Sequence, residues 1–278
     1  MSRPGALFRN EMLKTFKRLA SWVTLGFFSF IVFMSFGDEY LDARKDPERV
    51  FALPDAWPKI FDDLSFVGLI FGSVLLILMV AGEFSWRTAR QNVIDGLSKS
   101  RWFWAKTILI PLLAVVFIGE LVSVGGFFAY LGTDTSVAIG PLIGASQWAA
   151  IGGLLLGFTL LASMAFASAM GIRSQGPAMA VWFFYIGFGE RLILGALAQL
   201  GDWIQPALRF APFNTVQSGL ANYLQWDPVA LQAAVARALE NDRNPPEIWD
   251  TGTLLITAIG WLAFFILGSF LWFRRRDL

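Results

Sequence analysis

Six long runs of apolar residues, separated by segments rich in charge, glycine or proline, dominate the pattern of the chain. A helix of about 20 apolar residues is long enough to cross the hydrocarbon core of a bilayer. The pattern therefore predicts an all-α, polytopic membrane protein that forms one transmembrane domain over residues 1–278. The six predicted spans cover about 20–36, 64–81, 107–131, 147–170, 177–197 and 251–273.

The N-terminal segment before the first span is amphipathic. Over residues 5–20, Phe8, Met12 and Phe16 recur at helical spacing, and basic residues occupy the other faces. This arrangement is typical of a helix that lies in the membrane interface. The alternative is that the helix simply extends the first span.

Two segments outside the spans differ in character. The polar segment 37–63 is typical of an external loop. The segment 198–250, with the residues just before it, contains the apolar stretches 192–200, 204–213 and 229–239, which are interrupted by residues such as Gly201 and Pro206. Broken helices at membrane depth persist only where protein or water covers their free backbone groups. We therefore predict a short re-entrant hairpin there, followed by a small external amphipathic helix within Val229–Leu239.

The distribution of charge predicts the orientation of the spans. The N-terminus, the segment 83–106, Arg173 and the C-terminal arginines together hold more basic than acidic residues, and the opposite segments hold more acidic ones. Positively charged segments stay on the cytoplasmic side. Both termini are therefore predicted to be cytoplasmic, in a multi-pass protein of the cytoplasmic (inner) membrane. The Arg274 to Arg276 tail also favours contact with anionic membrane lipid.

The composition supports a bilayer location and excludes most catalytic chemistry. The chain is 56% hydrophobic and 15% charged, and it has no cysteine and no histidine. Ser-His-Asp and Cys-His catalytic groups, the HExxH zinc site and most transition-metal sites need those residues. We therefore predict no catalytic residues and no metal site. We also predict no nucleic-acid partner, because no pattern of stacking aromatic and basic residues suggests one. Small residues over 152–157 suit close packing of helices.

The segment between the second and third spans carries the most informative polar pattern. Residues Thr88 to Asp95 are compatible with a short helix, and Gly96 can end it. Arg87, Arg90 and Asp95 flank a small apolar face. A short cytoplasmic helix of this kind, within 83–98, is suited to dock in a groove of a partner protein. It would transmit movement of that partner to the second and third spans.

The spacing of polar residues here, joined to the six-span topology, resembles a known family. An acidic residue, a threonine, a serine, a lysine and a second lysine follow one another as Glu83, Thr88, Ser98, Lys99 and Lys106. The whole chain resembles the membrane subunits of ATP-binding-cassette exporters of the second type. It departs from them at two positions, where the family usually has glycine and proline. The chain has Arg87 and Gly96 there.

The resemblance implies that this chain is a permease subunit and that the central short helix is the coupling helix of a separate cassette ATPase. The chain has no GxxxxGK[ST] phosphate loop. It would thus have no cofactor of its own, and the partner subunit would bind and hydrolyse ATP with magnesium. A second copy of the chain or a sibling permease would complete the assembly. The implied coupling residues are Glu83, Arg87, Thr88, Arg90, Asp95, Lys99 and Lys106.

Three charged residues fall inside the predicted spans. Glu120 lies in the third span, and Glu190 and Arg191 lie in the outer half of the fifth. A charge at membrane depth costs at least ~2.5 kcal/mol, so it faces protein or water and often has a function. Each of the three has two interpretations: a structural partner within the bundle, or a polar site for substrate or protons.

Two other functions are compatible with the sequence. The chain could be a proton-coupled secondary transporter that works alone through Glu120 and Glu190. It could also be a scaffold without transport activity in a larger ATP-driven membrane assembly. Replacing Glu83 would affect an ATPase-coupled permease, whereas replacing Glu120 would affect a proton-coupled transporter.

Overall fold

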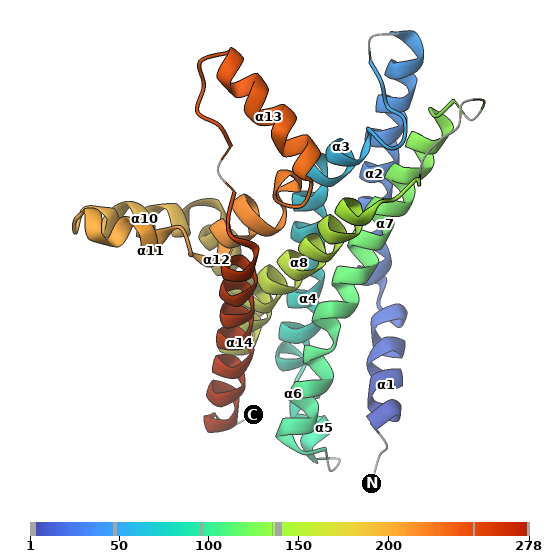
Figure 1. Ribbon diagram of the computed structural model, residues 1–278. Helices are drawn as coiled ribbons and strands as arrows, with labels where there is room; N and C mark the ends of the chain where they lie inside the picture. Colours follow the sequence, from blue (N-terminus) through green and yellow to red (C-terminus); the bar gives the residue numbers. More distant parts are fainter. Residues whose placement is uncertain are drawn as a thin grey trace.

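The computed structural model describes residues 4–46, 49–94, 97–134, 136, 141–246 and 248–276, and this part of the chain is helical without strands (Figure 1). The α-helices are α1 (Pro4–Lys17), α2 (Leu19–Lys45), α3 (Trp57–Asp63), α4 (Ser65–Ser85), α5 (Thr88–Ile94), α6 (Lys99–Thr107), α7 (Leu109–Leu131), α8 (Ala145–Ile172), α9 (Gln175–Phe184), α10 (Glu190–Ala198), α11 (Gln205–Leu208), α12 (Pro212–Asn214), α13 (Pro228–Glu240) and α14 (Thr251–Arg275). Two π-helical segments, η1 (Tyr185–Gly189) and η3 (Thr215–Leu220), and two 3-10 turns, η2 (Asp202–Ile204) and η4 (Tyr223–Gln225), connect them.

Among the described residues, six helical stretches are long and apolar enough to cross a membrane, which fits the predicted all-helical, multi-pass membrane protein. They are Leu19–Lys45, Trp57–Ser85, Lys99–Leu131, Ala145–Ile172, Gln175–Ala198 and Thr251–Arg275. The first stretch is longer than predicted. The segment 37–63, expected to be a loop, contains the end of α2 and all of α3. Charge pairs one turn apart, such as Asp42 with Lys45 at 3.3 Å, support this extension.

α4 and α8 form the centre of the bundle. Among the most apolar 18 residues of each stretch, 67% are buried in α8 and 61% in Trp57–Ser85, which contains α4. In α14 only 17% are buried. Glycine allows the two central helices to meet, since a Cβ atom on Gly72 would lie 2.2 Å from the ring of Phe158. The outer helices expose apolar side chains such as Phe30 and Ile256, as expected of membrane spans.

The bundle has two distinct ends (Figure 1). We name the end that carries α5 and the described chain ends, Pro4 and Arg276, the basal end. The other, which carries α3 and α13, is the distal end. At the basal end, α1 is separated from α2 by Arg18, whose backbone is extended with φ −84° and ψ 127°. α1 is therefore a separate helix rather than the first turns of α2.

Between α9 and α14 the chain leaves the bundle and returns. α10 and α11 pack against each other and project sideways from the other helices (Figure 1). The chain then comes back as α12 and η3, which pack on α8. α13 matches the helix predicted within Val229–Leu239. The structure thus contains a helical hairpin in the predicted region, and its insertion into the membrane stays a prediction.

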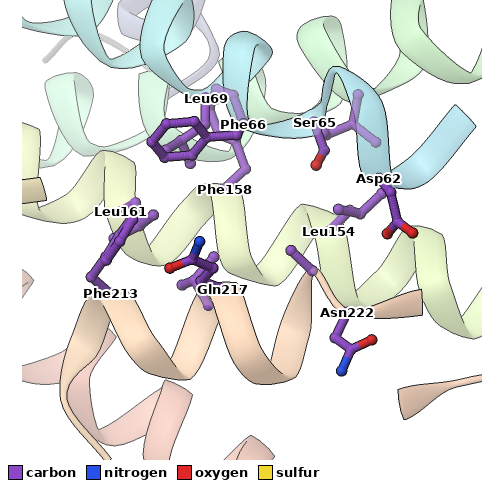
Figure 2. Close-up of a pocket in the computed structure, with 13 residues that line it drawn as sticks. Asp62, Ser65, Phe66, Leu69, Leu154, Phe158, Leu161, Phe213, Gln217 and Asn222 are labelled. Carbon is purple, nitrogen blue, oxygen red and sulfur yellow. The ribbon is translucent and has the colours of Figure 1, made fainter. Parts of the chain in front are cut away.

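A cavity of about 260 Å³ lies between the α3–α4 junction, α8 and η3 (Figure 2). Small residues of α8 allow η3 to approach at this place. A Cβ atom on Gly153 would lie 2.6 Å from the carbonyl oxygen of Leu220, and one on Gly157 would lie 3.0 Å from Val216. The close packing predicted for 152–157 is therefore present.

Candidate functional site

The short helix predicted between the second and third spans is present as α5 at the basal end. It packs on α4 and α6 but exposes Arg90 and Ile94, the latter by 66%. Arg87, just before α5, is exposed and has a φ of 57°. This left-handed conformation is the one that glycine adopts most easily. A sharp turn therefore presents α5 on the surface of the basal end.

Next to α5, Glu83 and Lys106 form an ion pair inside the protein. Glu83 lies in the last turn of α4 and Lys106 near the end of α6, and they are 1% and 2% exposed. The indole Nε1 of Trp102 donates a hydrogen bond of 3.1 Å to Oε2 of Glu83. Because an unpaired buried charge is very unfavourable, these contacts are what allow both charges to stay in the interior.

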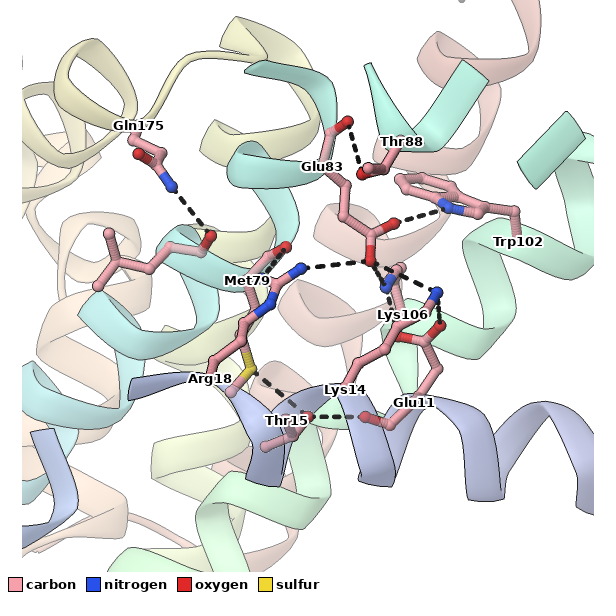
Figure 3. A network of polar contacts seen from close by, with 11 residues as sticks. Glu11, Lys14, Thr15, Arg18, Met79, Glu83, Thr88, Trp102, Lys106 and Gln175 are labelled. Carbon is pink, nitrogen blue, oxygen red and sulfur yellow. Dashed lines mark hydrogen bonds and ion pairs between the residues drawn. The ribbon is translucent and has the colours of Figure 1, made fainter. Parts of the chain in front are cut away.

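α1 and Arg18, which directly follows it, supply the remaining members of the group. Lys106 forms a second ion pair, with Glu11 of α1. Lys14 Nζ lies 3.8 Å from Oε1 of Glu83, and Arg18 Nη2 lies 3.7 Å from the same atom (Figure 3). We name these five residues the basal charge cluster: Glu11, Lys14, Arg18, Glu83 and Lys106.

The basal charge cluster joins α1 to α4 and α6, which come much later in the sequence. Moving each ion out of water costs several kcal/mol, which is offset only where good geometry and further hydrogen bonds accompany the pair. Arg18 meets this condition with a second contact, since its Nη1 donates 3.2 Å to the carbonyl oxygen of Met79. The cluster therefore fixes α1 against the basal ends of α4 and α6, and movement of one helix disturbs the contacts of the others.

The turn between α4 and α5 is attached to the same cluster. The hydroxyl of Thr88 donates 3.2 Å to the carbonyl oxygen of Glu83. The guanidinium of Arg18 lies 5.4 Å from the centre of the Trp86 ring, within the range of a cation–π contact. α5 is thus held by side chains of both its own turn and α1.

The predicted coupling residues do not all come together. Glu83, Thr88 and Lys106 are in contact through the cluster, whereas Lys99 lies apart and donates 3.1 Å to the carbonyl oxygen of Arg276. Asp95 lies outside the described residues. The described part of the coupling set therefore divides into the buried pair Glu83 and Lys106 and residues that lie at or near the surface.

Sequence reasoning missed three of the five cluster residues, Glu11, Lys14 and Arg18, which contact Glu83 or Lys106. It also missed Trp102, which binds Glu83. The only signal was that Glu11 is the single acidic residue within 1–20. An acidic residue in a basic helix is a candidate partner for a buried lysine. Its partner lies 95 residues later, and nothing in the pattern identifies it.

Glu190 is buried by a different set of partners. It is 4% exposed, and its carboxylate accepts hydrogen bonds from the Tyr185 hydroxyl at 2.6 Å and from the backbone N–H groups of Phe213 and Asn214, both at 2.8 Å. Those N–H groups belong to the first turn of the helix formed by α12 and η3. A carboxylate is favourable at a helix N-terminus, where N–H groups lack intrahelical partners. Glu190 therefore ties the base of the hairpin to the returning chain.

The other two charges within the spans are separate from Glu190. Glu120 is half-buried on α7, where Ser29 of α2 is its hydrogen-bonding partner. Arg191 is exposed, and the described residues show no ion pair for it, unlike the partner expected from the sequence. Glu120 and Glu190 are held by partners on different elements, so the structure does not join them in one polar site.

No group of three or more Cys, His, Asp or Glu side chains that could hold a metal ion occurs among the described residues. Comparison with known proteins finds no family model that matches this chain and no matching sequence among curated proteins.

Proposed function

We propose that this chain is the permease subunit of an ATP-binding-cassette exporter, and that α5 is the helix that receives the movement of a separate ATPase. The observation that carries the proposal is the position of α5. It is exposed at the basal end, and its base is fixed to the buried Glu83–Lys106 pair. The permease would provide the path for a hydrophobic or amphipathic substrate.

The basal charge cluster explains how such a helix could transmit force. Glu83 lies in the last turn of α4, and Lys106 lies near the end of α6, just before α7, so the turn that carries α5 is bonded to both spans. Packed interiors transmit displacement because they resist compression. A push on α5 would therefore move α4 and α7 together. The left-handed backbone at Arg87 also supports the resemblance, since the family usually has glycine there.

The distribution of charge supports an orientation of the chain in the membrane. The basal end, with both termini, faces the cytoplasm in the cytoplasmic membrane, and α1 lies in the interface. The α10–α11 hairpin is re-entrant, a placement supported by Leu192 and Trp203, which are 62% and 77% exposed. A second copy or a sibling permease completes the path, and ATP and magnesium are bound by the ATPase.

The proposal is tested by purifying the tagged chain from its native host and identifying co-purifying proteins. We expect a stoichiometric cassette ATPase with vanadate-sensitive ATP hydrolysis. Arg90→Glu reverses an exposed charge on α5 and is expected to reduce co-purification at least tenfold, since close like charges at an interface cost several kcal/mol. Arg275→Glu, an exposed charge at the end of α14, is the matched control and should retain the ATPase.

An ATPase-free chain in this experiment would contradict the proposal. So would an ATPase whose recovery is the same with Arg90→Glu as with the control. Proton-coupled transport through Glu120, or a scaffold role, would then be the function to test.

A further inference from the structure

A second cavity, which we name the basal groove, lies between the α1–α2 junction, α4 and the start of α9, and has a volume of about 440 Å³. Its lining carries polar groups of Arg18, Ser21, Trp86 and Gln175, and apolar side chains such as Leu75 form the rest. Arg18 directly precedes α2, and Trp86 directly follows α4. The polar groups of the groove therefore lie where two of the candidate spans end, and its apolar lining lies within the spans.

The basal groove is open to the surroundings of the protein. Two residues of its lining, Leu19 and Trp86, are 77% and 62% exposed. Trp22, near the start of α2, is exposed as well. Tryptophan is enriched at the headgroup level of membranes, where its ring lies partly in lipid and partly in water. In a bilayer crossed by α2 and α4, the groove is therefore accessible to lipid.

Arg18 brings hydrogen-bond donors and positive charge to the groove. A guanidinium has five N–H donors. Among the described residues, Arg18 makes one hydrogen bond, from Nη1 to the carbonyl oxygen of Met79 at 3.2 Å, and its Nη2 lies 3.7 Å from the carboxylate of Glu83. The side chain is 22% exposed. Further donors are therefore available to an anion, and the planar guanidinium fits the geometry of a phosphate.

The basal charge cluster leaves a surplus of positive charge beside the groove. It holds three basic residues, Lys14, Arg18 and Lys106, against the carboxylates of two glutamates. Lys17, which is exposed directly before Arg18, adds to the surplus. This charge favours an anion, and basic pockets between membrane helices bind the headgroups of anionic lipids.

Ser21 is an independent indication of a polar ligand. It lines the groove and is 1% exposed, and its hydroxyl has no hydrogen-bond partner among the described residues. Other buried serines satisfy the hydroxyl within their helix, as Ser163 does by donating 2.6 Å to the carbonyl oxygen of Leu160. A buried hydroxyl without a partner is unfavourable. A phosphate oxygen would supply the acceptor that Ser21 lacks.

The polar side chains of the groove are held on α4 before any ligand arrives (Figure 3). Gln175 donates 3.2 Å to the carbonyl oxygen of Leu78, and Arg18 binds the carbonyl oxygen of the next residue. Both approach the same turn of α4, because a Cβ atom on Gly82 would lie 2.7 Å from Gln175 Nε2 and 4.0 Å from Arg18 Nη1. A preformed site lowers the cost of ordering side chains on binding.

We propose that the basal groove binds one anionic phospholipid, with its phosphate at Arg18 and Ser21 and the first part of an acyl chain along Leu75 and Leu78. The volume of about 440 Å³ lies within the roughly 300–1,000 Å³ of small-ligand sites. The groove thus holds the phosphate and part of one chain, and the rest of the lipid stays in the bilayer. The bound lipid would join the start of α2 to α4 and α9, and its binding requires no ATPase.

The test is native mass spectrometry of the purified full chain, released from nanodiscs that contain equal amounts of phosphatidylglycerol and phosphatidylcholine with the same acyl chains. Both lipids carry the phosphate, but the choline cation cancels its charge. We expect about a tenfold preference for phosphatidylglycerol, equivalent to ~1.4 kcal/mol. Arg18→Gln should abolish this preference. Arg9→Gln removes the same charge from an exposed position on α1 that does not line the groove, and should retain it.

A second variant tests the location without changing a charge, because loss of Arg18 also disturbs the basal charge cluster. Ala20→Phe fills the groove from an exposed position of its lining and should abolish retention of phosphatidylglycerol. Val23→Phe introduces the same ring at an exposed position of the same helix that does not line the groove, and is the matched control.

Three results would overturn the proposal: equal retention of the two lipids, equal behaviour of Arg18→Gln and Arg9→Gln, or equal retention by Ala20→Phe and Val23→Phe. Free glycerol 3-phosphate should not displace the lipid, since the acyl chain contributes to binding. Displacement would identify a free phosphate ester as the ligand and would also overturn the proposal. None of these measurements involves an ATPase, so this proposal and the permease function fail independently.

Discussion

Glu83 and Glu190 are both carboxylates buried in the bundle, 1% and 4% exposed, but the protein compensates their charges by different means. Glu83 faces the cations of Lys106, Lys14 and Arg18, which come from other helices. Glu190 is held by a hydroxyl and two backbone N–H groups. The first arrangement ties three helices together through long side chains. The second fixes the start of one helix and depends on the backbone.

The two ways of compensating a buried carboxylate are suited to different functions. Buried ion pairs are sensitive to loss of one partner, because the other charge then stays uncompensated in the interior. A helix N-terminus presents its N–H groups whatever the side chains are. The basal charge cluster is therefore suited to transmit movement between helices, and the Glu190 contact is suited to hold the first turn of the helix formed by α12 and η3 still.

The largest effect is expected from removing the shared cation of the cluster. Lys106→Met leaves Glu11 and Glu83 buried with weaker partners, and we expect it to lower the free energy of unfolding by about 3–5 kcal/mol. Denaturant unfolding in detergent, followed by circular dichroism, measures the change. Lys99→Met is the control, since Lys99 loses only a hydrogen bond to a backbone carbonyl and should cost at most about 1.5 kcal/mol.

A double variant sharpens this result. If Glu83 and Lys106 interact directly, the double variant Glu83→Gln/Lys106→Met should be more stable than the sum of the single changes predicts, by about 0.5–3 kcal/mol. Additive losses would show that the two residues contribute separately, and the cluster would then not be a single unit.

A smaller and local effect is expected at Glu190. Glu190→Gln replaces charge-assisted hydrogen bonds to Phe213 and Asn214 with at most one neutral bond, and we expect a loss of about 1.5–3 kcal/mol. Hydrogen exchange of those two amides should accelerate, while peptides of α4 and α6 remain protected. Glu240→Gln, at an exposed position ending α13, should change neither. Equal acceleration throughout the bundle would argue against a local role.

The smallest expected effect is a local response of the start of α14 to low pH. Asp250 precedes α14, and the N–H and hydroxyl of Thr253, at 2.8 and 2.9 Å, hold the pKa of its carboxyl below the usual value. A carboxyl whose pKa is lower in the folded state stabilises that state above its unfolded pKa of about 3.9, and the contribution disappears as pH falls through the folded pKa. We therefore expect the first turn of α14 to fray in acid.

Hydrogen exchange at Thr253, corrected for the intrinsic pH dependence, measures this fraying. Asp250→Asn should remove the acid dependence, because the amide does not titrate. An unchanged acid response in that variant would assign the fraying to another group.

The sequence predicted the parts of the fold that depend on long runs of one character. Six apolar runs give six long helical stretches among the described residues, and the polar segment between the second and third gives α5. The extension of α2 to Lys45 was missed, because charge pairs one turn apart can stabilise a helix made of polar residues.

The candidate site was harder to predict, since its partners are chosen by three-dimensional contact. Glu83 and Lys106 were identified, but Glu11 joins them from a helix that was read only as amphipathic. Glu190 was recognised as a charge that needs a partner, yet backbone N–H groups have no signature in a sequence. No residue type at Phe213 or Asn214 indicates that its N–H binds a carboxylate.

The long separation between Glu11 and Lys106 has a consequence for synthesis of the protein. The two residues are 95 positions apart, so α1 leaves the ribosome well before its partner on α6 exists. At ~5–20 residues per second, the delay is on the order of 5–20 s. During that time α1 has been synthesised but lacks the contact with Lys106 that fixes it. Its docking therefore requires only that the first two spans and α6 have been made, before α7 and the rest of the chain follow.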